Sequence, residues 1–176
     1  MIYTIQDDFL PPQDFEYVKD SLMSRHMIWH YNDYTISKEY DHEPQFIHNF
    51  IGIENGHGGI IKSQYIDAVS PILNRIPNLC TMIRCKANLT LRDTENRETG
   101  MHVDTEKSFD GYTSIYYLNT TDGGTIFETG EIAECKANRL VTFNNRVKHS
   151  GLHCTDKNRR IIVNLNYTVW GANDKL

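Results

Sequence analysis

The segment GMHVD, residues 100–104, places a histidine and an aspartate two positions apart. In an extended chain, residues i and i+2 point to the same side, so His102 and Asp104 can direct an imidazole and a carboxylate at one metal ion. Taken alone, such a pair is weak evidence, because it is more often an ordinary polar dipeptide at the start of a strand. A metal site therefore requires a third ligand elsewhere in the chain.

Two histidines in the segment NNRVKHSGLHCTDKNRR, residues 144–160, are candidates for that ligand, His149 and His153. Two histidines and one carboxylate form the facial triad of non-haem iron(II) oxygenases, which leaves coordination positions open for other molecules. The set contains no thiolate, and this disfavours a structural zinc site. The pattern therefore favours an iron(II) centre over a structural metal.

The segment RRIIVNLNY, residues 159–167, is typical of a strand with one apolar and one polar face. The apolar face comprises Ile161, Val163, Leu165 and Tyr167, and the other face comprises Arg160, Ile162, Asn164 and Asn166. We expect Arg160 to lie in a pocket with the asparagines and Arg159 to point outward. An arginine fork binds a carboxylate through two hydrogen bonds and stays charged. On spacing alone, a plain strand with a solvated basic start fits equally well.

The segment TMIRCKANLTLR, residues 81–92, shows the same alternation. Its apolar positions Ala87, Leu89 and Leu91 leave Lys86, Asn88, Thr90 and Arg92 on the opposite face. A polar face inside a barrel would line a pocket. Asn88, Thr90 and Arg92 therefore all remain candidates for contact with a ligand there.

The elements that must position these residues change in period along the chain. Residues 11–24 have helical spacing, and so do residues 61–76, where Pro71 predicts a kink or two pieces. A short strand and a turn are expected within 1–10, and strands at 29–36 and 45–53. A series of short strands follows from residue 80 onward, at 81–92, 112–119, 123–129, 139–145 and 159–170. This order predicts an α+β fold with an antiparallel sandwich or barrel.

Three loops are expected near the polar residues. The glycine-rich segment ENGHGG, residues 54–59, is predicted to be a flexible loop and a candidate lid. Residues 92–100 are predicted to be a charged loop that orders on binding, and residues 105–111 a loop that contacts substrate.

Composition fits one soluble domain. The chain has 176 residues, a net charge of -5 and a pI near 5.9, which argue against a large nucleic-acid footprint. Its 4 cysteines match no zinc module, and we expect reduced thiols. Neither a signal peptide nor a membrane-spanning run is recognisable, so a cytoplasmic protein without membrane contact is expected. Nothing in the sequence indicates the oligomeric state.

Five motifs together resemble the prolyl-4-hydroxylase-like branch of the iron(II)- and 2-oxoglutarate-dependent dioxygenases. They are HVD, SIYYLN, GGTIF, HSG and the arginine that opens RIIVNLNY, in that order along the chain. The resemblance covers roughly residues 80–170 and implies a double-stranded β-helix core there, with helical support over about 1–79, all in a single domain.

The resemblance also implies roles for individual residues. His102, Asp104 and His149 would hold iron(II), and Arg160 would bind the distal carboxylate of the cosubstrate 2-oxoglutarate. Tyr117 matches a family position whose side chain reaches the cosubstrate. The residues expected to complete the cosubstrate pocket are Asn88, Thr90 and Asn164.

The activity implied is hydroxylation of a peptide or small-molecule substrate, with peptidyl proline as the family's suggestion. Dioxygen would be consumed, 2-oxoglutarate would be converted to succinate, and ascorbate is a candidate accessory cofactor. The alternative is a metal-binding β-barrel module without turnover, because fold does not imply function. The four residues His102, Asp104, His149 and Arg160 favour the enzyme, since a degenerate barrel has little reason to keep all of them.

Overall fold

The computed structural model describes residues 2–36, 44–55, 57–104 and 110–171. Its helical elements are α1 (Pro12–Met23), the 3-10 helix η1 (Ile66–Val69) and α2 (Ser70–Arg75). Its strands are β1 (Tyr3–Gln6), β2 (His30–Asn32), β3 (Gln45–Glu54), β4 (His57–Ile61), β5 (Leu79–Leu91), β6 (Tyr112–Tyr117), β7 (Gly124–Phe127), β8 (Ile132–Glu134), β9 (Arg139–Asn144), β10 (His149–Leu152) and β11 (Arg159–Val169).

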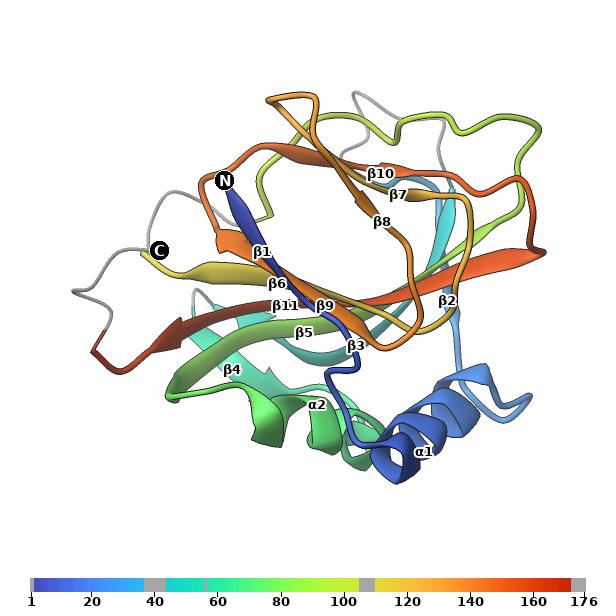
Figure 1. The fold of residues 1–176 in the computed structure, drawn as a ribbon. Helices are drawn as coiled ribbons and strands as arrows, with labels where there is room; N and C mark the ends of the chain where they lie inside the picture. The colour runs from blue at the N-terminus through green and yellow to red at the C-terminus, as the bar shows by residue number, and fades with distance from the viewer. Residues whose placement is uncertain (1, 37–43, 56, 105–109, 172–176) are drawn as a thin grey trace.

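Two antiparallel sheets face each other as a double-stranded β-helix. The larger sheet has the strand order β1-β9-β6-β11-β5-β3-β2, with β4 paired to β3, and the smaller has the order β10-β7-β8. The small sheet lies on one side of the large sheet and the helices lie on the other (Figure 1). The expected α+β class and double-stranded β-helix are confirmed, and the large sheet includes β1, β2 and β3 from the N-terminal part of the chain.

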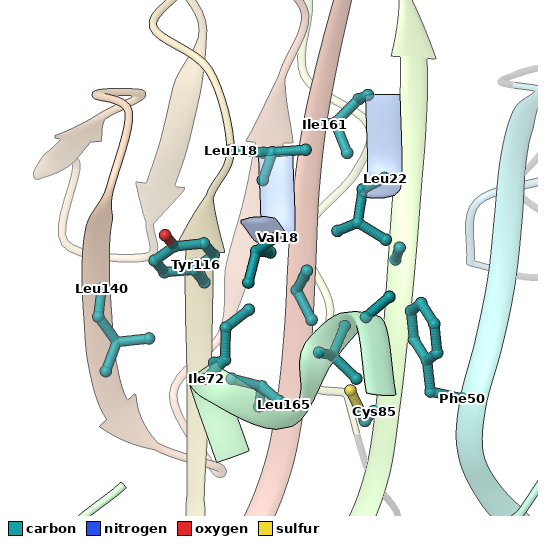
Figure 2. Packing of buried hydrophobic residues seen from close by; sticks show 14 of the residues in the cluster. Val18, Leu22, Phe50, Ile72, Cys85, Tyr116, Leu118, Leu140, Ile161 and Leu165 are labelled. Atoms are coloured by element: carbon teal, nitrogen blue, oxygen red, sulfur yellow. The ribbon is translucent and has the colours of Figure 1, made fainter. Parts of the chain in front are cut away.

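The face of the large sheet toward the helices carries the main hydrophobic core. Val18 and Leu22 of α1 and Ile72 of α2 pack against Ile161 and Leu165 of β11 (Figure 2). These side chains are all essentially inaccessible to solvent. The helical spacing of residues 11–24 therefore does bury one stripe of α1, as amphipathic helices do.

The second helical segment forms two pieces near Pro71, which is one of the two outcomes expected there, the other being a kink. The 3-10 helix η1 ends at Val69 and α2 begins at Ser70, with the proline in its first turn, where no hydrogen bond from its nitrogen is needed. The prediction of a helix upstream of Ile66 is wrong, because β4 ends at Ile61 and residues 62–65 form a connection of coil and turn.

The expectation of a flexible loop and lid at residues 54–59 is also wrong. Residues from His57 onward form β4, which pairs with β3 in a hairpin in which Glu54 lies opposite His57. Asn55 has a φ of 51°, the left-handed conformation that a tight turn between such strands requires. Gly58 permits a close approach of β4 to β5, because a Cβ there would lie 3.0 Å from the side chain of Ile83. Sequence composition cannot distinguish such a hairpin from a loop.

Candidate metal and cosubstrate site

A backbone pairing brings the two histidines of the candidate site together. His102 and His149 lie opposite each other in an isolated antiparallel bridge, and each backbone N–H donates to the other's carbonyl at 3.0 Å. Residues opposite each other in such a pair project to the same face. The ring centroids accordingly lie 4.8 Å apart.

Nδ1 of each imidazole ring lies within hydrogen-bond distance of a backbone carbonyl oxygen. Nδ1 of His102 lies 2.9 Å from the carbonyl oxygen of Gly100, and Nδ1 of His149 lies 3.2 Å from that of Val147. In a neutral ring whose Nδ1 donates to such a carbonyl, the lone pair of Nε2 is available to a metal ion. Gly100 has a φ of 105°, a backbone conformation suited to glycine, and a Cβ there would lie 2.8 Å from the side chain of Ile36.

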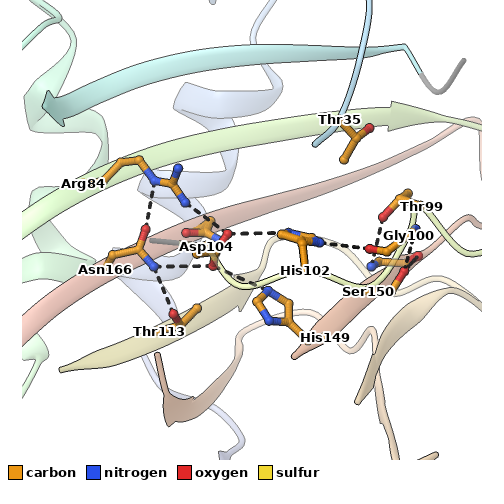
Figure 3. Close-up of polar contacts among 12 residues, drawn as sticks. Thr35, Arg84, Thr99, Gly100, His102, Asp104, Thr113, His149, Ser150 and Asn166 are labelled. Atoms are coloured by element: carbon orange, nitrogen blue, oxygen red, sulfur yellow. Dashed lines mark hydrogen bonds and ion pairs between the residues drawn. The ribbon is translucent and has the colours of Figure 1, made fainter. Parts of the chain in front are cut away.

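The carboxylate of Asp104 completes the cluster (Figure 3). Its two oxygens lie 3.7 Å from Nε2 of His102 and 3.5 Å from Nε2 of His149. One candidate ligand atom from each of the three residues lies within 4.8 Å of the other two. The geometry suits one metal ion bound by two imidazoles and one carboxylate, which is the donor set that iron(II) takes in a facial triad.

Three neighbouring side chains donate hydrogen bonds to Asp104. Arg84 donates to Oδ1 at 3.0 Å, Asn164 donates to Oδ2 at 2.8 Å, and Asn166 lies 3.4 Å from the same oxygen. Burial raises the pKa of Asp104, but hydrogen bonds from His102 and His149 and the charge of Arg84 outweigh it and hold the pKa well below its usual range. Asp104 is therefore ionised at neutral pH, as a metal ligand must be.

The three residues share a cavity of about 150 Å³ with Arg160. Arg160 is 4 % exposed, and its Nη2 donates to the carbonyl of Gly124 at 2.7 Å. Its Nε has no hydrogen-bond partner among the described residues. Other buried polar atoms of the cavity wall that lack partners in the described part of the chain are Oδ1 of Asn88, Oγ1 of Thr90 and Oδ1 of Asn164. Buried polar groups without partners are rare, and together they indicate a polar ligand.

The structure therefore places Asn88, Thr90, Asn164 and Arg160 in the cavity wall, beside the three candidate metal ligands. Arg92 lies beyond the end of β5 and is exposed, so the choice left open by the sequence falls on Asn88 and Thr90.

Tyr117 differs from its expected place. Its hydroxyl donates to Oγ1 of Thr125 at 2.7 Å, and Thr125, not Tyr117, is among the residues that line the cavity. The charge of Arg160 lies 5.6 Å from the centre of the Tyr117 ring. Burial raises the pKa of Tyr117 to about 12, so its hydroxyl remains protonated. Tyr117 therefore supports Arg160 and Thr125 from behind the cavity wall.

The other histidine, His153, is buried, and its Nδ1 lies 3.9 Å from a carboxylate oxygen of Asp93. It belongs neither to the three-residue cluster nor to the cavity lining. Residues 92–100 are bonded to β10 and to the residues that follow it, because the N–H of Thr99 donates to the carbonyl of Gly151 and that of Asp93 to the carbonyl of Cys154, both at 2.9 Å. The expected substrate-contacting loop, residues 105–111, lies mostly outside the described residues.

Sequence reasoning missed several residues of the site. Arg84 is the most important, and a signal for it was available, because it shares the alternation of Lys86, Asn88 and Thr90 on β5. Gln45 and Thr125 reach the cavity from β3 and β7, and no local pattern marks either of them.

Comparison with solved structures agrees with this architecture. An oxidoreductase of the 2OG-Fe(II) oxygenase family from Burkholderia pseudomallei superimposes with a TM-score of 0.70 at 10% identity, over 95% of this chain and 85% of that chain. The fold is that of the 2-oxoglutarate- and iron(II)-dependent oxygenases. At this identity the likeness concerns the fold, and the chemistry must be argued from the site.

Two further similar structures extend the comparison. A Trichoplax adhaerens prolyl hydroxylase, in complex with a hypoxia inducible factor peptide fragment, has a TM-score of 0.65 at 14% identity, over 99% of this chain and 88% of that one. The non-heme alpha ketoglutarate dependent epimerase SnoN of nogalamycin biosynthesis has a TM-score of 0.66 at 12% identity, over 96% of this chain and 78% of that chain. The suspected prolyl-4-hydroxylase-like resemblance is thus confirmed at the level of fold. Neither a protein-family model nor a curated protein sequence matches the chain.

Proposed function

We propose that this protein is an iron(II)- and 2-oxoglutarate-dependent dioxygenase that hydroxylates its substrate. One observation carries the proposal: the same cavity contains the cluster of His102, Asp104 and His149 and a buried Arg160 whose Nε lacks a partner. The first group fits iron(II), and the second fits the distal carboxylate of 2-oxoglutarate. When bound, iron(II) and 2-oxoglutarate supply the oxidation of a C–H bond by dioxygen, with release of succinate and carbon dioxide.

The contributions of the protein are binding, orientation and exclusion of water. Arg160 would bind the distal carboxylate, and Thr90 lies directly across from it on β5 with a hydroxyl oxygen that has no hydrogen-bond partner among the residues described. Arg84 and the asparagines of β11 hold the carboxylate of Asp104 in position. Ile115 and Ile162 supply apolar wall and limit the access of water. No side chain of the cavity is required to act as nucleophile.

The decisive experiment is anaerobic addition of iron(II) and then 2-oxoglutarate, with detection of the metal-to-ligand charge-transfer band. We expect the band in the wild type and its loss in His102→Ala, whereas His26→Ala, which changes an exposed histidine on another surface, retains it. A wild type without the band overturns the proposal. Metal binding without 2-oxoglutarate binding would favour the alternative, a metal-binding barrel without turnover.

For the substrate we propose a peptide or small molecule, with peptidyl proline as the first class to test. The support is the likeness to a prolyl hydroxylase with a bound peptide, while the epimerase shows that the same fold also serves another reaction. Succinate release stimulated by proline-containing peptides, compared with free metabolites and with and without ascorbate, would decide. Absence of stimulation by any peptide would remove the prolyl assignment.

We also propose a cytoplasmic location, supported by 4 free cysteines. Subcellular fractionation tests it, and recovery outside the cytoplasm would contradict it. No helix in the described part of the chain has the length and hydropathy needed to cross a membrane.

A further inference from the structure

The cavity contains a lysine that the proposed chemistry does not use. Lys86 of β5 lines the cavity, one alternation step from Asn88. Within the described residues, the ammonium group of Lys86 has neither a hydrogen-bond acceptor nor an ion-pair partner. Lys86 is half-buried. Its ammonium group therefore gives up part of its hydration without gaining a partner, and an anion bound there would compensate.

Strand register separates Lys86 from the residue expected to bind 2-oxoglutarate. Arg160 lies opposite Thr90, whereas Lys86 lies opposite Asn164, which bonds Asp104. Thr90 and Lys86 are four positions apart on one strand, which corresponds to about 13 Å along the chain. Lys86 therefore belongs to the end of the cavity near Asp104, away from the end where the distal carboxylate of the cosubstrate would lie.

The balance of charge supports the same conclusion. The described cavity lining contains three cationic residues, Arg84, Lys86 and Arg160, and one carboxylate, Asp104. Asp104 and the two carboxylates of 2-oxoglutarate would balance the charges of iron(II) and Arg160, which leaves the positive charges of Arg84 and Lys86. Arg84 is held by hydrogen bonds to Asp104 and Asn166, so Lys86 is the cation that remains unengaged.

We propose that Lys86 forms a subsite for an anionic group of the substrate, a carboxylate or a phosphate, near the metal end of the cavity. This inference rests on the proposed function, because it takes the bound anion to be part of the substrate of that dioxygenase. In a peptide the group would be an acidic side chain or a terminal carboxylate. A neutral substrate would leave the lysine unpaired.

The titration of Lys86 is consistent with this subsite. Burial, together with the charge of Arg84, lowers its pKa to about 8, and Asp104 partly offsets the shift. At neutral pH most of the lysine is still charged, and a bound anion would favour the charged form further.

The test uses small anions with the intact chain loaded with zinc(II) and 2-oxoglutarate. Acetate and methyl phosphate are titrated separately, with acetamide as the uncharged control, and binding is followed by amide chemical shifts along β5. The variants are Lys86→Met, Lys86→Arg and, as a matched control, Lys19→Met on α1, where the lysine is 36% exposed and pairs with Glu16. The two anions distinguish a carboxylate site from a phosphate site.

We expect the wild type to bind at least one anion, and Lys86→Met to bind it at least tenfold more weakly. Lys86→Arg should stay within a few-fold of the wild type, and Lys19→Met should match it. The iron(II)–2-oxoglutarate band should be unchanged in every variant, which separates failure of this subsite from failure of the proposed function. Absence of anion binding by the wild type, or equal binding by Lys86→Met, overturns the subsite.

Discussion

The replacement Arg160→Met tests whether the buried arginine is present for a ligand or for the fold. The side chain is 4 % exposed, and in the described structure it donates to the carbonyl of Gly124 but has an unpartnered Nε. Hydrogen bonds to charged partners contribute about 1.5–3 kcal/mol each. Loss of two such bonds from the guanidinium fork to a carboxylate costs roughly 3 kcal/mol or more, which corresponds to at least about a hundredfold weaker binding.

The stability of the free protein should respond differently. Arg160→Met leaves the Gly124 carbonyl without its donor, which costs about 1–3 kcal/mol. It also removes a buried cation that has no carboxylate partner in the described residues, and such a cation carries a desolvation penalty of several kcal/mol. The two effects oppose each other, so the free energy of unfolding should fall by no more than about 2 kcal/mol.

The assays are calorimetric titration of 2-oxoglutarate into the manganese(II)-loaded protein and urea unfolding of the metal-free protein. Arg159→Met is the matched control, since the neighbouring arginine is absent from the cavity lining. Binding of 2-oxoglutarate by Arg160→Met within threefold of the wild type would refute the assignment. So would equal weakening by Arg159→Met.

Three further predictions concern stability and reactivity. The hydrogen bond from Arg97, and that from the Thr94 N–H, lower the pKa of Asp93 to about 2. Asp93→Asn should therefore lower the melting temperature at neutral pH, and the difference from wild type should shrink as pH falls from about 4 toward 2; a difference independent of pH would contradict this. Tyr116→Phe removes a 2.9 Å hydrogen bond to Asn138 and should cost about 1 kcal/mol in urea unfolding, and no loss would show that the bond contributes nothing. Burial raises the pKa of the Cys85 thiol, so this cysteine should resist a thiol reagent until the protein unfolds, and rapid labelling of the native protein would contradict its burial.

Alternation along the strands predicted much of the candidate site. Because β5 and β11 are regular over the relevant residues, most of the alternate positions identified in the sequence line the cavity, including Asn88 and Arg160. Arg92 and Asn166 are the exceptions. The family resemblance singled out Tyr117, which packs between the two sheets, whereas Tyr116 packs in the core on the helix side. It could not show that Thr125 of β7 fills the space in front of the Tyr117 hydroxyl, because that contact depends on the packing of two sheets.

Contacts between distant segments account for the other differences. The contact of Arg84 with Asp104 joins β5 to the segment that follows residue 100, and no short sequence pattern encodes it. The hairpin of β3 and β4 was missed for a related reason, since exposed glycines and isoleucines fit a loop until a neighbouring strand supplies hydrogen-bond partners.

One face of β11 contributes to the stability of the fold, and the other contributes to the candidate binding site. Ile161 and Leu165 point to the core beneath the helices, whereas Arg160 and Asn164 point to the cavity between the sheets. The cavity face is less favourable for folding, because it buries polar atoms without partners. The opposite face compensates, since each fully buried aliphatic side chain contributes roughly 1.5–3 kcal/mol. Substitutions on one face should therefore change stability, and those on the other should change ligand binding, although the residues are adjacent in sequence.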